Sequence, residues 1–133
     1  MGRRGFGITP SVPRPVRAVE GAQGQTETLP AADQLRYDAW LADQAHRRGL
    51  SAALKNDLDQ IHRLLPYFDF ALDEECFQYH ECWKLKPFVT AGKAVFDVEY
   101  SLSTSKFCPK AKALNFNSLK KHLALGPWRV ACR

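Results

Sequence analysis

The chain has 133 residues, of which 45% are hydrophobic, and its formal net charge is +5. This length provides the core of one ordinary domain, but it is below the roughly 250 residues of a complete eight-stranded β/α barrel. No apolar run approaches the length that crosses a bilayer, so we predict no membrane partner.

The positive charge is concentrated at the start of the chain. Before residue 21, four arginines against one glutamate give a net +3, which leaves +2 for the remaining 113 residues. Aromatic residues do not alternate with these arginines in the pattern typical of nucleic-acid binding. We interpret this stretch as a solvated basic tail and predict no nucleic-acid partner, with salt-sensitive DNA binding as the alternative. It lacks the apolar core of a signal peptide.

Residues 1–30 are rich in proline and glycine and show no periodicity, which predicts an irregular or disordered segment. The folded domain is expected over residues 31–133. Its first helix carries apolar residues at helical spacing from Leu35 to Ala45, and Gly49 stands where a helix stop belongs.

Short apolar runs alternate with amphipathic helices along the rest of the chain. Strands are predicted over residues 50–54, 67–72, 94–98 and 116–119. Helices are predicted between them over residues 57–65, 77–91 and 103–114. This alternation favours an α/β fold with a parallel sheet and right-handed crossovers. Four such strands can form half a barrel or a small open sheet, and periodicity alone does not choose between them.

Polar side chains follow each predicted strand. They are Lys55, Asn56 and Asp57, then Asp73 and Glu74, then Glu99 and Tyr100, and finally Lys120 and Lys121. Active sites of parallel α/β folds lie at the carboxyl ends of the strands, so these residues are candidates for a site. The alternative is that strand ends are polar only because they meet solvent. Acids at such a rim suit glycoside hydrolysis, which uses two carboxyl groups, and they attract a cationic substrate.

Four cysteines occur in this short chain: Cys76, Cys82, Cys108 and Cys132. An even number favours disulfides and an oxidising compartment, although three pairings are open. Cys76 and Cys82 are near enough in sequence to close locally, and Cys108 would then tie the last helix to Cys132. A zinc site is the rival, but no Cys-x-x-Cys spacing exists. The acids show no metal-ligand spacing either, so we predict neither a metal nor a cofactor.

The run from Asp73 to Cys82 reads Asp-Glu-Glu-Cys-Phe-Gln-Tyr-His-Glu-Cys. Other distinctive stretches are AADQLRYDAWLADQAHRRGL, LKNDLDQ, PFVTAGKAVFDVEY and FCPKAKALNFNSLKKHLAL. Together these stretches resemble, in the correct order, the C-terminal half of glycoside hydrolase family 114, the endo-α-1,4-polygalactosaminidases. The resemblance covers about 100 residues and anchors on the Asp73–Cys82 run.

The resemblance implies a partial (β/α)8 barrel, about strands five to eight with their helices, that acts on cationic α-1,4-linked galactosamine polymers. Glu74 matches a catalytic glutamate of the family, and its neighbour Asp73 should point to the opposite face of the strand. The paired cysteines of the family match Cys76 and Cys82, where a disulfide would brace the catalytic loop. The residues expected to contact the substrate are Lys55, Asn56, Asp57, Asp73, Gln78, Glu99, Tyr100 and Lys120.

The sequence departs from the family before its first helix. The family carries a second catalytic carboxylate on an aspartate there, whereas this chain has Glu20 and no aspartate before Asp33. The first three strands of the barrel are also missing. We therefore expect a truncated barrel that does not hydrolyse the polymer alone, with a non-catalytic sugar-binding remnant as the alternative. An exposed half-barrel is expected to self-associate, and the family implies a secreted or extracellular location.

Overall fold

The computed structural model describes residues 30–132. The segment predicted to be irregular, residues 1–30, lies outside this range except for Pro30. The elements in chain order are α1 (Ala31–Arg47), β1 (Ala53–Lys55), η1 (Leu58–Gln60), α2 (Ile61–Leu64), β2 (Phe70–Glu74), η2 (Cys82–Leu85), α3 (Lys86–Thr90), β3 (Val95–Glu99), α4 (Thr104–Leu114), β4 (Asn117–Lys121) and β5 (Arg129–Ala131). No helix in this range is long and apolar enough to cross a membrane.

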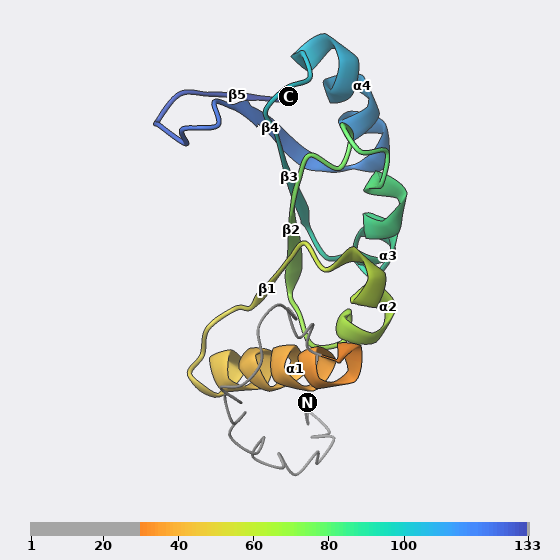
Figure 1. Ribbon diagram of the computed structural model, residues 1–133, viewed down its shortest axis with the longest axis vertical. Helices are drawn as coiled ribbons and strands as arrows, with labels where there is room; N and C mark the ends of the chain where they lie inside the picture. Colours follow the sequence, from red (N-terminus) through yellow and green to blue (C-terminus); the bar gives the residue numbers. More distant parts are fainter. Residues whose placement is uncertain (1–29, 133) are drawn as a thin grey trace, which may run out of the picture.

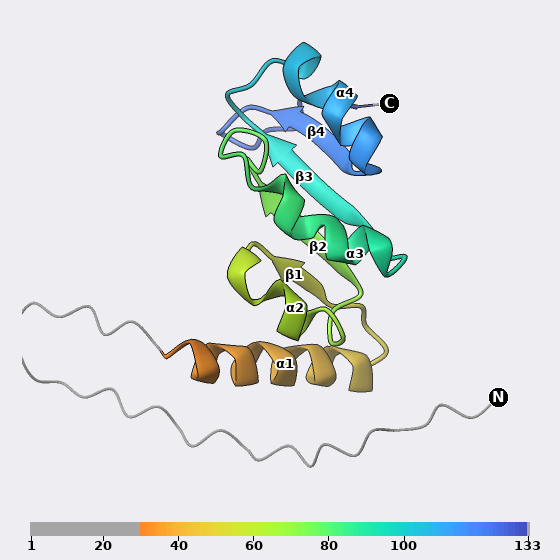
Figure 2. The ribbon, with the colours of Figure 1, turned by 90° about the vertical axis from the view of Figure 1, so that its right-hand side faces the viewer.

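The strands form one sheet in the order β1-β2-β3-β4-β5 (Figure 1). The first three pairs of strands are parallel, and β5 pairs antiparallel with β4. Helices α2, α3 and α4 lie on one side of the sheet, and α1 lies near the β1 edge (Figure 2). The predicted α/β class with a parallel sheet is confirmed, and β5 is an addition that the sequence did not predict.

One face of the sheet is buried against the helices. Alternate strand residues point to opposite faces, and those on this face include Leu54, Ala71 and Val95. They belong to the same core as Phe88 of α3 and Phe107 of α4, both of which are completely buried. Each fully buried apolar side chain of this size contributes about 1.5–3 kcal/mol, so this layer provides the main stabilisation of the fold.

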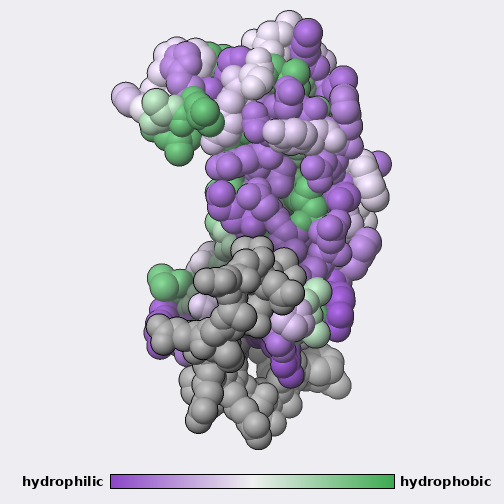
Figure 3. Space-filling view, viewed as in Figure 1, coloured by the Kyte–Doolittle hydropathy of each residue, from purple (hydrophilic) through white to green (hydrophobic). Residues whose placement is uncertain are grey.

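The opposite face, which we call the open face, carries no helix among residues 30–132 (Figure 1). Phe70 and Phe96 lie on it in edge-to-face geometry, with ring centroids 5.6 Å apart, and Phe96 is 40% exposed. Hydrophobic surface also gathers on the connection between β4 and β5, at the upper left of Figure 3. Leu123 and Leu125 are exposed there. The open face corresponds to the inner surface of the partial barrel that the family resemblance implies.

The helix predicted over residues 77–91 is wrong in its first third, residues 77–81. Residues 75–81 form turns, and helical structure begins only with η2 at Cys82. Glu75 and His80 have φ of 63° and 61°, a left-handed conformation that an α-helix does not contain. We call residues 75–81 the rim loop.

Two predicted strands begin three residues later than expected, and one strand was missed. The strands predicted over 50–54 and 67–72 begin at Ala53 and Phe70, because the apolar residues before them belong to the connections. All three residues of β5 (Arg129–Ala131) are exposed, so this strand has no alternating pattern by which the sequence could have revealed it.

The cysteines form two disulfides. Cys76 pairs with Cys82, which closes the rim loop, and Cys108 of α4 pairs with Cys132. The pairing in which the nearer cysteines close locally is therefore confirmed. The described residues hold no free cysteine, so the alternative zinc site has no thiolate ligand.

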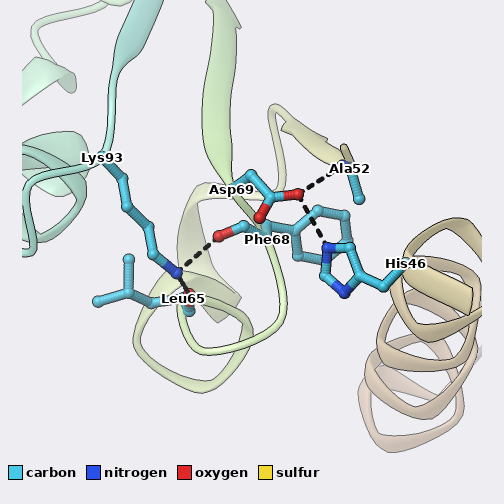
Figure 4. Close-up of polar contacts among 6 residues, drawn as sticks. All are labelled: His46, Ala52, Leu65, Phe68, Asp69 and Lys93. Atoms are coloured by element: carbon cyan, nitrogen blue, oxygen red, sulfur yellow. Dashed lines mark hydrogen bonds and ion pairs between the residues drawn. The ribbon is translucent and has the colours of Figure 1, made fainter. Parts of the chain in front are cut away.

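A polar network holds the amino ends of the strands (Figure 4). Oδ2 of Asp69 accepts a hydrogen bond from the backbone N–H of Ala52 at 2.7 Å and lies 2.8 Å from Nε2 of His46. The bond from Ala52 is the main reason that the pKa of Asp69 lies below its usual value, and the contact with His46 lowers it further. Through Asp69, the start of β2 is connected to α1 and to the segment before β1.

Lys93 supports the same end of the sheet, and its removal is expected to destabilise the fold. Its Nζ donates to the carbonyls of Leu65 and Phe68, at 2.6 and 2.7 Å (Figure 4). Lys93→Met leaves both carbonyls without this donor, so we expect the free energy of unfolding to fall by about 1–3 kcal/mol in chemical denaturation. Lys112→Met, at an exposed position of α4, should change it by less than about 0.5 kcal/mol. Equal values for the two variants would contradict this role of Lys93.

Candidate active site

The parallel strands contain four acidic residues, of which a single one points to the open face. Asp73, Asp97 and Glu99 are at most 2% exposed and face the helices. Glu74, at the carboxyl end of β2, alternates with Asp73, and its side chain is 37% exposed. The sequence led us to expect that Asp73 and Glu74 point in opposite directions, and their burial agrees with this expectation.

Residues from the ends of two neighbouring strands contact Glu74. Nζ of Lys55 lies 3.5 Å from its Oε1, and the hydroxyl of Tyr100 donates to the same oxygen at 3.3 Å. The backbone N–H of Glu74 donates to Oδ1 of Asn56, also at 3.3 Å. We call Lys55, Asn56, Glu74 and Tyr100 the Glu74 cluster. It brings together four of the residues that the sequence singled out.

Tyr100 is protonated in this cluster. Burial raises the pKa of its hydroxyl, and the charge of Glu74 raises that pKa further. The phenol therefore remains a hydrogen-bond donor to the carboxylate at neutral pH. Lys55 is half exposed, so its ion pair with Glu74 contributes only about 0–1 kcal/mol to stability. Its ammonium group can thus move away from Glu74 at little cost when another cation arrives.

The backbone is strained beside the Glu74 cluster. Asn56 and Asp57, which follow β1, have φ of 56° and 49°, and Glu75, which follows β2, has φ of 63°. Non-glycine residues in this region cost of order 1–3 kcal/mol each, although asparagine and aspartate tolerate it best. Such conformations are concentrated at functional sites, which agrees with a site at this end of the sheet.

A second group of acids lies on the helix side. Asp73 and Asp97 are register partners in β2 and β3. Burial raises the pKa of each to about 7, with further increases from the charge of Glu81 at Asp73 and of Glu99 at Asp97. Between about pH 4 and pH 7, these two carboxyl groups therefore keep protons that exposed aspartates have released.

Three further residues expected to contact the substrate have other surroundings. Oε1 of Glu99 accepts from the backbone N–H of Phe77 at 2.7 Å, inside the rim loop. Nζ of Lys120 donates to the carbonyl of Leu102 at 2.6 Å. Asp57 has a pKa raised by burial and then by the charges of Asp38 and Asp59. These interactions involve residues other than Glu74.

Gln78 also lies away from the Glu74 cluster. It lines a hollow of about 380 Å³, and the other residues around this hollow are Phe77, His80, Leu102, Lys106 and Lys110. A second hollow, of about 550 Å³, lies among the helices and is lined in part by Trp83 and Pro87. Neither hollow includes Glu74, which instead stands on the open face.

One group of potential metal ligands exists in residues 30–132. Ligand atoms of Asp73, Cys76 and Asp97 lie within 4.8 Å of one another. The sulfur of Cys76 is bonded to Cys82, so it cannot act as a thiolate. The remaining two carboxyl groups are too few to form a hard-cation site by themselves.

Asp97 belongs to the buried acid group, but the sequence did not mark it as a candidate. The signal was present, because Val95, Asp97 and Glu99 alternate along one strand and must share a face. That alternation predicts that Asp97 and Glu99 lie with Val95 in the core. Glu99 was instead assigned to the rim because of its position at the end of the strand.

Comparison with known proteins agrees with the fold. The chain is similar to the structure described as "Crystal Structure of Aspergillus fumigatus Ega3 complex with galactosamine", with 32% identity, a TM-score of 0.72, and coverage of 78% of this chain and 47% of that chain. It thus spans about half the length of the solved structure that it matches, which supports the predicted partial barrel. No curated protein matches. The model of glycoside-hydrolase family GH114 matches residues 19–133, and the chain therefore belongs to this family.

Proposed function

We propose that this chain carries part of the active site of a glycoside hydrolase for galactosamine-containing polymers, with Glu74 as a catalytic carboxylate. The observation that carries the proposal is the orientation of Glu74. Among the four acidic residues of the parallel strands, Glu74 is the one whose side chain lies on the open face. It stands at the carboxyl end of β2, and active sites of such folds lie at the carboxyl ends of the strands. Membership of family GH114, and the galactosamine named with Ega3, support the substrate class.

The Glu74 cluster has the chemistry that a cationic sugar requires. A carboxylate attracts the ammonium group of a galactosamine unit, and a glutamate can also donate a proton to the oxygen of the glycosidic bond. Tyr100 orients Oε1 of Glu74 through its hydroxyl, and Lys55 balances the charge of Glu74 in the free site. An incoming ammonium group would then replace the ammonium of Lys55.

Hydrolysis needs a second carboxyl group on the same side of the sheet. Retaining enzymes hold the two groups about 5 Å apart, and inverting enzymes hold them about 6.5–9.5 Å apart. The other three acids of the parallel strands face the helices, so none of them can serve from the open face. We infer that the partner of Glu74 is not an acid of these strands. Because the chain has no aspartate before Asp33, where the family carries its second catalytic carboxylate, we expect the 133-residue chain to bind the polymer without cleaving it.

The same observation favours a second candidate function, which is sugar binding without cleavage. In that case no second carboxylate completes a catalytic pair with Glu74. The two disulfides and the family support an extracellular location for either function.

Incubation with an α-1,4-linked galactosamine polymer tests the proposal. We expect the chain to co-sediment with insoluble polymer and to release no reducing ends above the blank. Release that Glu74→Gln abolishes would contradict the expectation that this chain does not cleave the polymer, while it would support the catalytic role of Glu74. If the chain neither binds nor cleaves the polymer, the proposed function is wrong.

A further inference from the structure

The last residue of β3 and the residue after it contact the two sides of the β2 terminus. The side chain of Glu99 is completely buried on the helix side, and its Oε1 accepts from the backbone N–H groups of Phe77 and Gln78 at 2.7 and 3.4 Å. On the other side, the hydroxyl of Tyr100 donates to Oε1 of Glu74 at 3.3 Å. Two successive residues thus hold the rim loop and the Glu74 carboxylate.

The rim loop begins directly after Glu74, so its position determines where β2 ends. The backbone N–H of Glu75 donates to the carbonyl of Val98 at 2.9 Å, and that of Tyr79 donates to the carbonyl of Glu75 at 3.0 Å. The Cys76–Cys82 disulfide closes this segment into a ring. The carboxylate of Glu99 is a side-chain acceptor that connects this ring to β3.

We propose that Glu99 is a positioning residue, which fixes the rim loop on one side of the sheet so that Glu74 meets Tyr100 on the other. The proposal rests on the proposed function only for the contact between Glu74 and the sugar. The family resemblance leads to a different role for Glu99, as one of the residues that touch the substrate. Its complete burial and its two backbone donors assign it a different role.

The geometry makes the length of this side chain decisive. A backbone N–H that loses its acceptor in a buried site has no water to replace it, so the loop would shift to find another partner. Glu99→Asp keeps a carboxyl group but withdraws it by roughly one C–C bond, about 1.5 Å. Glu99→Gln keeps the reach and an acceptor oxygen while it removes the ionisable group. The two variants therefore test the length of the side chain and its ionisable group separately.

Nuclear magnetic resonance on the free 133-residue chain tests the proposal without any sugar. In Glu99→Asp we expect the amides of Phe77 and Gln78 to exchange with solvent at least about tenfold faster. We also expect the carboxyl-carbon resonance of Glu74 to move, because its contact with Tyr100 is loosened. Glu99→Gln should restore slow exchange at both amides. Ser118→Ala is the control, because it removes a buried hydroxyl from β4 on the side of the sheet where Glu99 also lies. It should leave all these signals unchanged.

Two results would overturn the proposal. The first is unchanged exchange at Phe77 and Gln78 in Glu99→Asp. The second is faster exchange there with an unmoved Glu74 resonance, since Glu99 would then brace the loop without positioning Glu74. Affinity for a galactosamine oligomer, measured on the same samples, should fall about threefold or more in Glu99→Asp and recover in Glu99→Gln. If the wild-type chain binds no oligomer, the proposed function fails, while the resonance signals still decide the role of Glu99.

Discussion

The free energy of unfolding is expected to fall as the pH rises from about 4 to about 7. Unfolded aspartates titrate near pH 3.9, whereas the pKa of Asp73 and that of Asp97 are both raised to about 7 in the fold. Between these values the folded chain holds protons that the unfolded chain has released. Each such carboxyl then removes about 1.4 kcal/mol of stability per pH unit, or about 4 kcal/mol over the whole range.

The sign of this dependence distinguishes the buried acids from Asp69. Asp69 has a lowered pKa, so its contribution is present above pH 4 and is lost only in stronger acid. The stability that protonated Asp73 and Asp97 contribute is instead complete below about pH 4, and it is lost as the pH rises through about 7. Because they are register neighbours and interact, their two effects should not be added in full.

Urea denaturation across this pH range measures the effect, and Asp97→Asn is the matched control. The amide keeps the shape of the protonated aspartate but cannot ionise, so the decline should be shallower by about one proton. We also expect the variant to be more stable than the wild-type chain at pH 8. A flat profile in the wild-type chain, or identical slopes in both chains, would show that these carboxyls do not hold protons in the fold.

The second large effect is expected from Phe107→Ala. Phe107 lies on α4, is completely buried, and packs against Phe77 of the rim loop with ring centroids 6.0 Å apart. Removing its ring leaves a cavity between helix, loop and sheet, so we expect a loss of about 3–5 kcal/mol in the free energy of unfolding. Calorimetry or urea denaturation at pH 5 measures this loss.

Phe96→Ala is the matched control on the open face, where Phe96 is 40% exposed. In a monomer it should cost about 1 kcal/mol or less, because much of the ring already meets water. A loss as large as that for Phe107→Ala, growing with protein concentration, would indicate that another copy covers this face. That result would support the self-association that we propose for an exposed half-barrel.

Much of the architecture could be predicted because its signals are local. Helix α1 follows from apolar residues at helical spacing between Leu35 and Ala45, and the order of strands and helices follows from the alternating runs. The opposite directions of Asp73 and Glu74 follow from strand geometry. These predictions depend on neighbours within a few residues, which is why a single sequence carries them.

The features that were missed depend on contacts distant in sequence. The rim loop reads as helical, but its disulfide and the buried carboxylate of Glu99 hold it in turns. Strand β5 is exposed and gains its regular structure only by pairing with β4. The surroundings of Lys120, which donates to the loop at Leu102, were equally invisible. In each case tertiary contacts override the local pattern.

The central claim is that the sugar site is built around Glu74. Its most direct test compares the affinities of Glu74→Gln and Asp73→Asn for a galactosamine oligomer at pH 6. The two variants replace adjacent carboxyl groups that point to opposite faces of β2. We predict that Glu74→Gln weakens binding about 10–100-fold, through loss of a charge-assisted contact, whereas Asp73→Asn binds like the wild-type chain. Equal affinities for Glu74→Gln and wild type, or a larger loss for Asp73→Asn, would contradict a sugar site built around Glu74.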